Sequence, residues 1–136
     1  MRHHSTLFVR WDDLDAYGHV NNAAYLTFVQ EARVDWCWSS RKRAGLEPIM
    51  VEMVVAKAEV DYLAPIYETN IDIDIEMWVI DIKRAAFTIE YAIKSNAGLH
   101  ARVKTVQVAI NPETKRARSL EEHEVAFLNQ YLEKEE

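Results

Sequence analysis

The segment from Ile71 to Val79 constrains the fold most tightly, because apolar side chains occupy every second position and acidic ones fill three of the four positions between them. The apolar positions are Ile71, Ile73, Ile75, Met77 and Val79, and the positions between them include Asp72, Asp74 and Glu76. Successive side chains of a β-strand point to opposite faces, so the pattern predicts a strand with one buried and one solvated face. Such a strand belongs in an antiparallel sheet whose apolar face is covered by another layer.

Four further segments have the composition or the alternation of strands. They are residues 6–11, 56–62, 87–94 and 99–110. The tetrapeptide Ser-Asn-Ala-Gly at 95–98 is typical of a hairpin turn, and Asn111-Pro112 ends the last segment. Hairpin-length connections between the later segments favour antiparallel pairing, so we expect one five-stranded antiparallel sheet.

One long helix is predicted, over residues 22–38. Asn21 or Asn22 can cap it, since an Asx side chain accepts a hydrogen bond from an N–H group two or three residues further on. The residues that recur at helical spacing behind the cap are Tyr25, Phe28, Val29, Ala32 and Trp36. Near the C-terminus, Ser119 and Glu122 have the spacing of a capping box and predict a short second helix.

The order of these elements predicts an α+β fold. Strand, long helix, four strands and short helix follow one another without a linker or repeat, so we expect a single domain over residues 1–136. The apolar face of the sheet needs a cover, and only the segment 22–38 is long enough to provide it. The expected architecture is therefore a sheet curled around one central helix.

Charge and cysteine content exclude several kinds of partner. The 136 residues carry a formal net charge of −6, which repels nucleic acid and anionic membrane surfaces. Cys37 is the single cysteine, which favours a reducing, cytoplasmic setting and is expected to be a buried apolar side chain. The chain shows no apolar run of a length typical of a signal peptide or a membrane span. We expect the histidines His3 and His4 to lie in a frayed end.

The segment DDLDAYGHVNNAAYL, residues 12–26, is the one stretch that could carry chemistry. Free N–H groups at a helix start stabilise negative charge, so a carbonyl held there is polarised. A nearby aspartate can attack that carbonyl or deprotonate a water that does. Without a strong acid to expel a poor leaving group, such a site favours thioesters over amides. Asp and Asn are also ordinary turn and cap residues, and the residues alone do not choose among the three aspartates.

The run RWDDLDAYGHVNNAAYLTFVQEAR, residues 10–33, resembles the opening motif of the hotdog-fold acyl-CoA thioesterases of the 4-hydroxybenzoyl-CoA thioesterase-like family. Residues 62–65, Tyr-Leu-Ala-Pro, resemble the proline-containing strand end found in that family. The resemblance implies the hotdog fold and hydrolysis of an acyl-CoA to a carboxylic acid and CoA, without a cofactor. It does not name the acyl group.

The same resemblance assigns roles to residues. Asp15 falls on the catalytic carboxylate, acting as general base or nucleophile, and Asp13 falls on a more variable acid. Backbone N–H groups near Asn22 would polarise the thioester. The expected substrate-binding residues are Gly18, His19, Asn22 and Tyr25. Some relatives have histidine at the position of Asn22, so His19 is expected to line the site without carrying protons.

The resemblance also implies a homodimer or homotetramer with sheets joined edge to edge and sites at subunit interfaces. Lys83 and Arg84, or the basic run 41–43, are the candidate contacts for the phosphates of CoA. The remaining histidines show no metal-ligand spacing, so no metal is expected. Two alternatives stay open: an acyl-thioester binding or scaffold protein without catalysis, and a hydratase or dehydratase. The second lacks its Asn-Pro-x-His segment, since Glu113 and Thr114 follow Asn111-Pro112.

Overall fold

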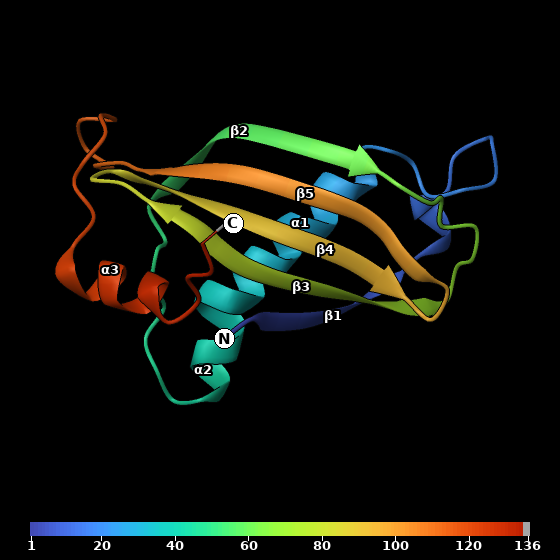
Figure 1. Ribbon diagram of the computed structural model, residues 1–136, viewed down its shortest axis with the longest axis horizontal. Helices are drawn as coiled ribbons and strands as arrows, with labels where there is room; N and C mark the ends of the chain where they lie inside the picture. Colours follow the sequence, from blue (N-terminus) through green and yellow to red (C-terminus); the bar gives the residue numbers. More distant parts are fainter. Residues whose placement is uncertain (135–136) are drawn as a thin grey trace.

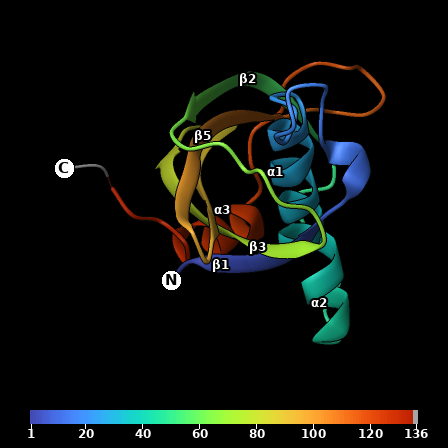
Figure 2. The same cartoon turned by 90° about the vertical axis from the view of Figure 1, so that its right-hand side faces the viewer.

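The computed structural model describes residues 1–134 and contains one five-stranded antiparallel sheet in the order β1-β3-β4-β5-β2. The strands are β1 (His3–Val9), β2 (Met53–Tyr62), β3 (Ile71–Ile82), β4 (Ala86–Ser95) and β5 (Gly98–Ala109). The helix α1 (Ala24–Val34) crosses one face of the sheet (Figure 1), and the end-on view shows the sheet as an arc with α1 on its inner side (Figure 2). The predicted α+β hotdog architecture is confirmed.

The apolar side chains whose spacing predicts β3 are the ones that the structure buries. The inward-facing side chains Ile73, Ile75, Met77 and Val79 are almost completely buried and contact the buried face of α1. A register shift between Val79 and Asp81 interrupts the pairing of β3 with β4. On the outer face, Trp78 is also buried, and the guanidinium of Arg2 lies 3.7 Å from the centre of its ring.

The predicted start of the sheet is wrong by three residues. The first strand begins at His3 and ends at Val9, and residues Trp11–Asp13 form a 3-10 turn, η1. His3 and His4 are not a frayed end, because their backbones pair with Met77 and Glu76 of β3. The pairing partner decides this boundary, and the local composition of residues 3–5 does not reveal it.

The central helix is longer and less regular than predicted. Beyond α1 the chain continues through a π-helical turn, η2 (Asp35–Ser39), into the short helix α2 (Ser40–Arg43). The predicted cap by Asn21 or Asn22 is wrong, because the N-cap position is Ala23 and no side chain caps the helix. Asn21 Oδ1 instead accepts a hydrogen bond from the Ala23 N–H at 2.9 Å in the turn that leads into the helix. The helix thus begins directly behind the polar loop that precedes it.

The capping box predicted for the C-terminal helix is wrong. The helix α3 (Glu122–Asn129) begins behind Glu121, whose N–H donates to Glu124 Oε1 at 2.8 Å. Ser119 lies outside the helix and accepts a hydrogen bond from the Arg84 guanidinium. Phe127 of α3 packs on Trp36 of η2, so α3 covers the C-terminal end of the central helix. None of the helices within residues 1–134 is both long and apolar enough to cross a membrane.

Candidate active site

The loop between β1 and α1 closes on itself through backbone hydrogen bonds. Leu14 and Val20 form an isolated antiparallel bridge, and the Asp15 N–H donates to the His19 carbonyl at 3.0 Å. Gly18 turns the chain with a φ of +80°, a conformation that costs a residue with a Cβ atom about 1 kcal/mol or more. Gly18 does not line the cavity described below, so its contribution is the shape of the turn.

The structure separates the three aspartates of this loop. Asp12 is exposed. Asp13 is buried, and its carboxylate accepts hydrogen bonds from the Arg10 N–H at 2.8 Å and the Arg10 guanidinium at 3.0 Å. Asp15 is the one of the three that lines a cavity. The cation that pairs with Asp13 therefore holds the loop, while Asp15 is left beside open space.

The cavity at Asp15 has a volume of about 550 Å³. Asp15, His19, Asn22 and Tyr25 form one wall, and the other wall comes from residues 62–65 at the end of β2. The two walls are tied together, because the Tyr62 hydroxyl donates to the Asn22 carbonyl at 2.8 Å. The loop and the end of β2 lie together at one end of the molecule (Figure 1).

The backbone N–H of Asn22, just ahead of the helix start, is left without an acceptor among residues 1–134. The backbone N–H groups of Val20, Asn21 and Ala24 donate to backbone carbonyls, and the Ala23 N–H donates to the Asn21 side chain. Asn22 lines the cavity beside Asp15, so its N–H is the candidate donor for a carbonyl oxygen bound at the positive end of α1.

The Asp15 carboxylate is held in place by its own loop. Its Oδ1 atom accepts a hydrogen bond from the Tyr17 N–H at 2.9 Å, and the side chain is 20% exposed. The His19 ring lies 3.9 Å from the same oxygen. Because His19 Nδ1 is 3.3 Å from the Val20 carbonyl, which can only accept, this contact requires the proton on Nδ1. His19 thus lines the cavity with its Nδ1 proton directed at a backbone carbonyl.

Tyr25 is a buried wall residue. Its ring packs edge-on against Tyr62 with the ring centres 5.1 Å apart. Burial raises the pKa of the Tyr25 hydroxyl, although a backbone hydrogen bond with Ile66 opposes the effect. The hydroxyl is therefore neutral at physiological pH.

Lys83 and Arg84 are not brought near Asp15 within one chain. They lie in the turn between β3 and β4, whereas the Asp15 loop adjoins Val9, the partner of Ile71 at the other end of β3. The 12 residues of β3 span about 40 Å. Of the basic run 41–43, Arg41 donates to the Glu47 carbonyl and Arg43 pairs with Asp35, again far from the loop.

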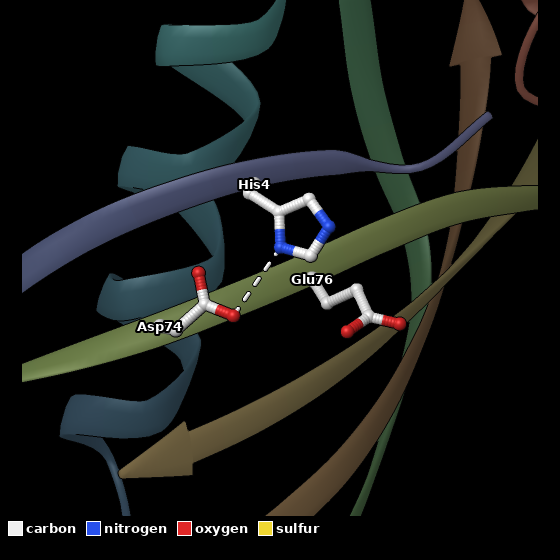
Figure 3. A group of neighbouring side chains, drawn as sticks. All are labelled: His4, Asp74 and Glu76. Carbon is white, nitrogen blue, oxygen red and sulfur yellow. Dashed lines mark hydrogen bonds and ion pairs between the residues drawn. The ribbon is translucent and has the colours of Figure 1, made fainter.

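One group with metal-ligand chemistry, not expected from the sequence, lies on the outer face of the sheet. His4, Asp74 and Glu76 come together where β1 pairs with β3 (Figure 3). His4 Nδ1 lies 3.3 Å from Asp74 Oδ2, while Glu76 is paired with Arg2 and with Lys94 at 3.0 Å. Because Arg2 and Lys94 already neutralise Glu76, the three side chains act as members of surface ion pairs.

A polar network inside the sheet was not expected from the sequence. Arg33 of α1 donates to the Tyr91 hydroxyl at 3.1 Å, and Tyr91 contacts the Thr105 hydroxyl at 2.7 Å. Gln107 donates to the same Thr105 oxygen at 2.7 Å. Thr105 and Gln107 occupy alternate, inward-facing positions of β5. That polar interruption of an otherwise apolar series was a signal available in the sequence.

The family model for the Thioesterase-like superfamily matches residues 9–128 of the chain. A 1,4-dihydroxy-2-naphthoyl-CoA hydrolase of Rippkaea orientalis is 29% identical over 132 residues, covering 90% of this chain and 92% of that protein. A thioesterase from Thermus thermophilus, solved with coenzyme A and zinc, is 26% identical with a TM-score of 0.78, covering 94% and 92% of the two chains. A predicted thioesterase from Bacillus stearothermophilus superposes with a TM-score of 0.84 at 19% identity over the full length of both chains.

The fold and the match over most of its length define the class: the chain belongs to the Thioesterase-like superfamily and is a thioester hydrolase. Among particular proteins it is similar to the naphthoyl-CoA hydrolase of Rippkaea orientalis along nearly the whole of both chains.

Proposed function

We propose that the protein is an acyl-CoA thioesterase that uses Asp15 as its catalytic carboxylate. The observation that carries the proposal is the pairing of two groups in one cavity: the Asp15 carboxylate and the Asn22 N–H, which has no acceptor among the described residues. A group that develops negative charge on an oxygen is stabilised by such a preorganised donor. Asp13 and Asp12 lack this placement.

The chemistry needs few groups. The thioester carbonyl lies against the Asn22 N–H, and Asp15 takes a proton from a water that adds to the carbonyl carbon. Collapse of the tetrahedral intermediate breaks the carbon–sulfur bond and releases a thiolate, which then takes up the proton. In the alternative route, Asp15 adds to the carbonyl itself, the carbon–sulfur bond breaks to release the thiolate, and water hydrolyses the resulting anhydride to the acid and free Asp15. A thiol with a pKa of about 8.5 is a good leaving group, so neither route requires a strong acid.

The relatives support coenzyme A as the carrier of the acyl group. The hydrolase from Rippkaea orientalis is named for a CoA thioester, and the Thermus thermophilus thioesterase was solved with coenzyme A. In each comparison more than nine-tenths of the relative's own length is matched. The cytoplasmic location remains a prediction from the cysteine content alone.

The exposed edge of the sheet favours a homodimer. The strand β2 pairs only with β5, and its other edge is unpaired within residues 1–134. Apolar side chains are exposed at this edge strand and its end, and on the adjacent face of α1 and η2: Leu26, Val34, Trp38, Val54, Val55, Tyr62 and Leu63. A long, apolar, unpaired edge is unfavourable in water, so we infer that two β2 strands pair across a two-fold axis.

The inferred assembly relates the cavity at Asp15 of one subunit to the candidate phosphate contacts of another. Tyr62 and Leu63 belong both to the cavity wall and to the exposed edge, so a partner chain would complete the site. Lys83 and Arg84 lie at the far end of the sheet from their own Asp15. They could meet the phosphates of CoA only at the site of another subunit.

A panel of acyl-CoA thioesters with detection of free thiol tests the proposal. The wild-type protein should release thiol from at least one substrate, and Asp15→Asn and Asp15→Ala should lose this activity while remaining folded. Full turnover by a folded Asp15 variant would remove the residue from the mechanism. Tight binding of acyl-CoA without thiol release would instead support the binding or scaffold alternative, and hydration of an enoyl-CoA would support the hydratase alternative.

A further inference from the structure

The segment 62–65, which forms the second wall of the cavity at Asp15, has little side-chain packing to hold it. At one end Tyr62 pairs with Ala101 of β5, and just beyond the other end Ile66 is buried. The side chains of the three residues between these two anchors are exposed. A segment without buried side chains depends on its hydrogen bonds for its position.

His100 of β5 supplies hydrogen bonds to the middle of this segment. Its carbonyl oxygen accepts from the Leu63 N–H at 2.9 Å and from the Ala64 N–H at 3.0 Å. Its ring nitrogen Nδ1 lies 2.9 Å from the Ala64 carbonyl oxygen. His100 does not line the cavity itself, so it acts on the cavity only through the wall that it holds.

An irregularity in β5 brings the His100 side chain to this position. In the pairing of β4 with β5, Ile93 faces Ala101. The next pair is Lys94 with Leu99, so the ladder passes over His100 as it does at a β-bulge. Strict alternation along β5 would place His100 on the outer face of the sheet, yet it is only 5% exposed. Bulges redirect side chains in this way and are frequent next to active sites.

The contacts of the imidazole define its tautomer and its orientation. Because the Ala64 carbonyl can only accept, the proton is on Nδ1. Nε2 lies 2.6 Å from the Ser95 hydroxyl oxygen, and in the neutral ring it accepts the hydroxyl proton. Ser95 is fixed in turn by the β4–β5 hairpin, since its hydroxyl oxygen accepts from the Ala97 N–H at 3.1 Å. The hairpin, the end of β2 and the Asp15 loop lie together at one end of the molecule (Figure 1).

The position of this wall sets the width of the cavity in which a thioester would lie. The Tyr62 hydroxyl and the Ile66 carbonyl each form a hydrogen bond of 2.8 Å with the backbone of the loop that carries Asp15. These two bonds fix the ends of the wall, whereas the bonds between Ala64 and His100 fix its middle. A misplacement of about 1 Å between reacting groups costs about 10²-fold in rate.

We propose that His100 is a positioning residue of the thioesterase site. Its Nδ1–H group holds the Ala64 carbonyl and thereby keeps the wall at the distance from Asp15 at which the thioester carbonyl meets the carboxylate and the Asn22 N–H. The inference rests on the proposed thioesterase function. It adds to that function a residue outside the cavity on which the rate depends.

Two substitutions separate the roles of the two ring nitrogens. In His100→Asn the side-chain amide lies near the place of Nδ1 and still donates to the Ala64 carbonyl. In His100→Gln the amide lies near the place of Nε2, so it keeps the contact with Ser95 and loses the one with Ala64. We expect His100→Gln to lower kcat and kcat/KM together by about tenfold or more, and His100→Asn to stay within about threefold of wild type. Thiol release from the best substrate of the acyl-CoA panel measures both.

Thermal unfolding of the same variants separates positioning from a general loss of structure. Each substitution removes one of the two hydrogen bonds of the imidazole, so the two melting temperatures should fall by similar amounts. A merely structural role would then lower the two activities alike. The variant His123→Gln is the matched control on an exposed histidine and should keep the wild-type kcat and melting temperature.

A measurement on the wild-type protein does not depend on how the variants fold. Nitrogen-15 spectra of the imidazole should show the proton of His100 on Nδ1. Saturation with acetonyl-CoA, which keeps a ketone carbonyl but has no thioester bond to break, should shift this signal although His100 does not line the cavity. An unchanged signal would overturn the inference.

The kinetic outcomes distinguish this inference from the function on which it rests. Equal kcat values in His100→Gln and His100→Asn, or a raised KM with unchanged kcat in His100→Gln, would overturn the positioning role. Thiol release by the wild type would leave the thioesterase function standing in either case. Absence of thiol release by the wild type across the panel would overturn the function, and the inference with it.

Discussion

An aspartate lies near each end of α1, but the two carboxylates differ in how many hydrogen bonds they accept. At the C-terminal end, Asp35 accepts hydrogen bonds from Arg43, Ser5 and His3, at 2.8 to 2.9 Å. At the N-terminal end, Asp15 accepts one backbone hydrogen bond and lines a cavity beside the unpaired Asn22 N–H. A carboxylate near a helix thus becomes a candidate for chemistry when the fold leaves it unsatisfied.

The variant Asp15→Asn should have the largest effect at the N-terminal end. Loss of a general base or nucleophile lowers kcat by about 10²–10⁴-fold. The amide keeps an acceptor for the Tyr17 N–H, so the melting temperature should hardly change. Steady-state thiol release and thermal unfolding measure the two quantities. The matched control is Asp35→Asn at the other end, which should lose stability and keep kcat; the reverse pattern would contradict the comparison.

The variant Phe127→Ala should have the largest effect on stability at the C-terminal end. The Phe127 ring is buried and packs on Trp36 and Tyr131 with ring centres 4.9 and 5.3 Å apart. Removing a buried aromatic ring costs about 3–5 kcal/mol of unfolding free energy. Urea unfolding measures the loss. A decrease under about 1 kcal/mol would mean that α3 does not hold this end of the helix.

The sequence predicted those parts of the fold that a local pattern determines. Strand β3 alternates because one of its faces is buried, and the pattern is visible without knowing the partner strand. The start of β1 at His3 depends on pairing with Met77. The π-helical turn at Asp35–Ser39 contacts β1 through Asp35 and α3 through Trp36, and both contacts are distant in the sequence. Neither has a local signature, so both escaped prediction.

The candidate site likewise contains residues that a local pattern predicts and residues whose role only the structure reveals. Asp15 and Asn22 could be proposed from a helix start and from a family motif, both of which are local. Residue chemistry alone did not separate Asp13 from Asp15, and the family motif made the choice; the structure adds a physical reason, because Arg10 reaches the Asp13 carboxylate. The residues Thr105 and Gln107 were visible as polar positions in β5, but their meaning required the position of Arg33 across the core.

The variant Asp13→Asn tests the comparison within a single loop. Asp13 is buried and accepts two hydrogen bonds from Arg10, so weakening them should lower the unfolding free energy by about 1–3 kcal/mol. Urea unfolding of Asp13→Asn beside Asp15→Asn measures the difference. Asp13→Asn should be the less stable of the two and the more active. Equal effects on kcat would mean that both carboxylates act on the substrate.

The smallest expected effect is the pH dependence of stability at the C-terminal end of α1. Its direction follows from the pKa of Asp35. Burial tends to raise the pKa of Asp35, but hydrogen bonds from Arg43, His3 and Ser5 outweigh it and lower the pKa below its ordinary value of 3.8. A carboxyl group whose pKa is lowered by folding adds stability above that value and loses it as the pH falls through the folded pKa. The unfolding free energy of wild type should therefore exceed that of Asp35→Asn by about 1 kcal/mol at pH 7, and the gap should begin to narrow below about pH 4. Melting temperatures of the two proteins between pH 7 and pH 3 measure the gap. A gap that widens on acidification would show that Asp35 is strained at this position, and the contrast between the satisfied and the unsatisfied end of the helix would fail.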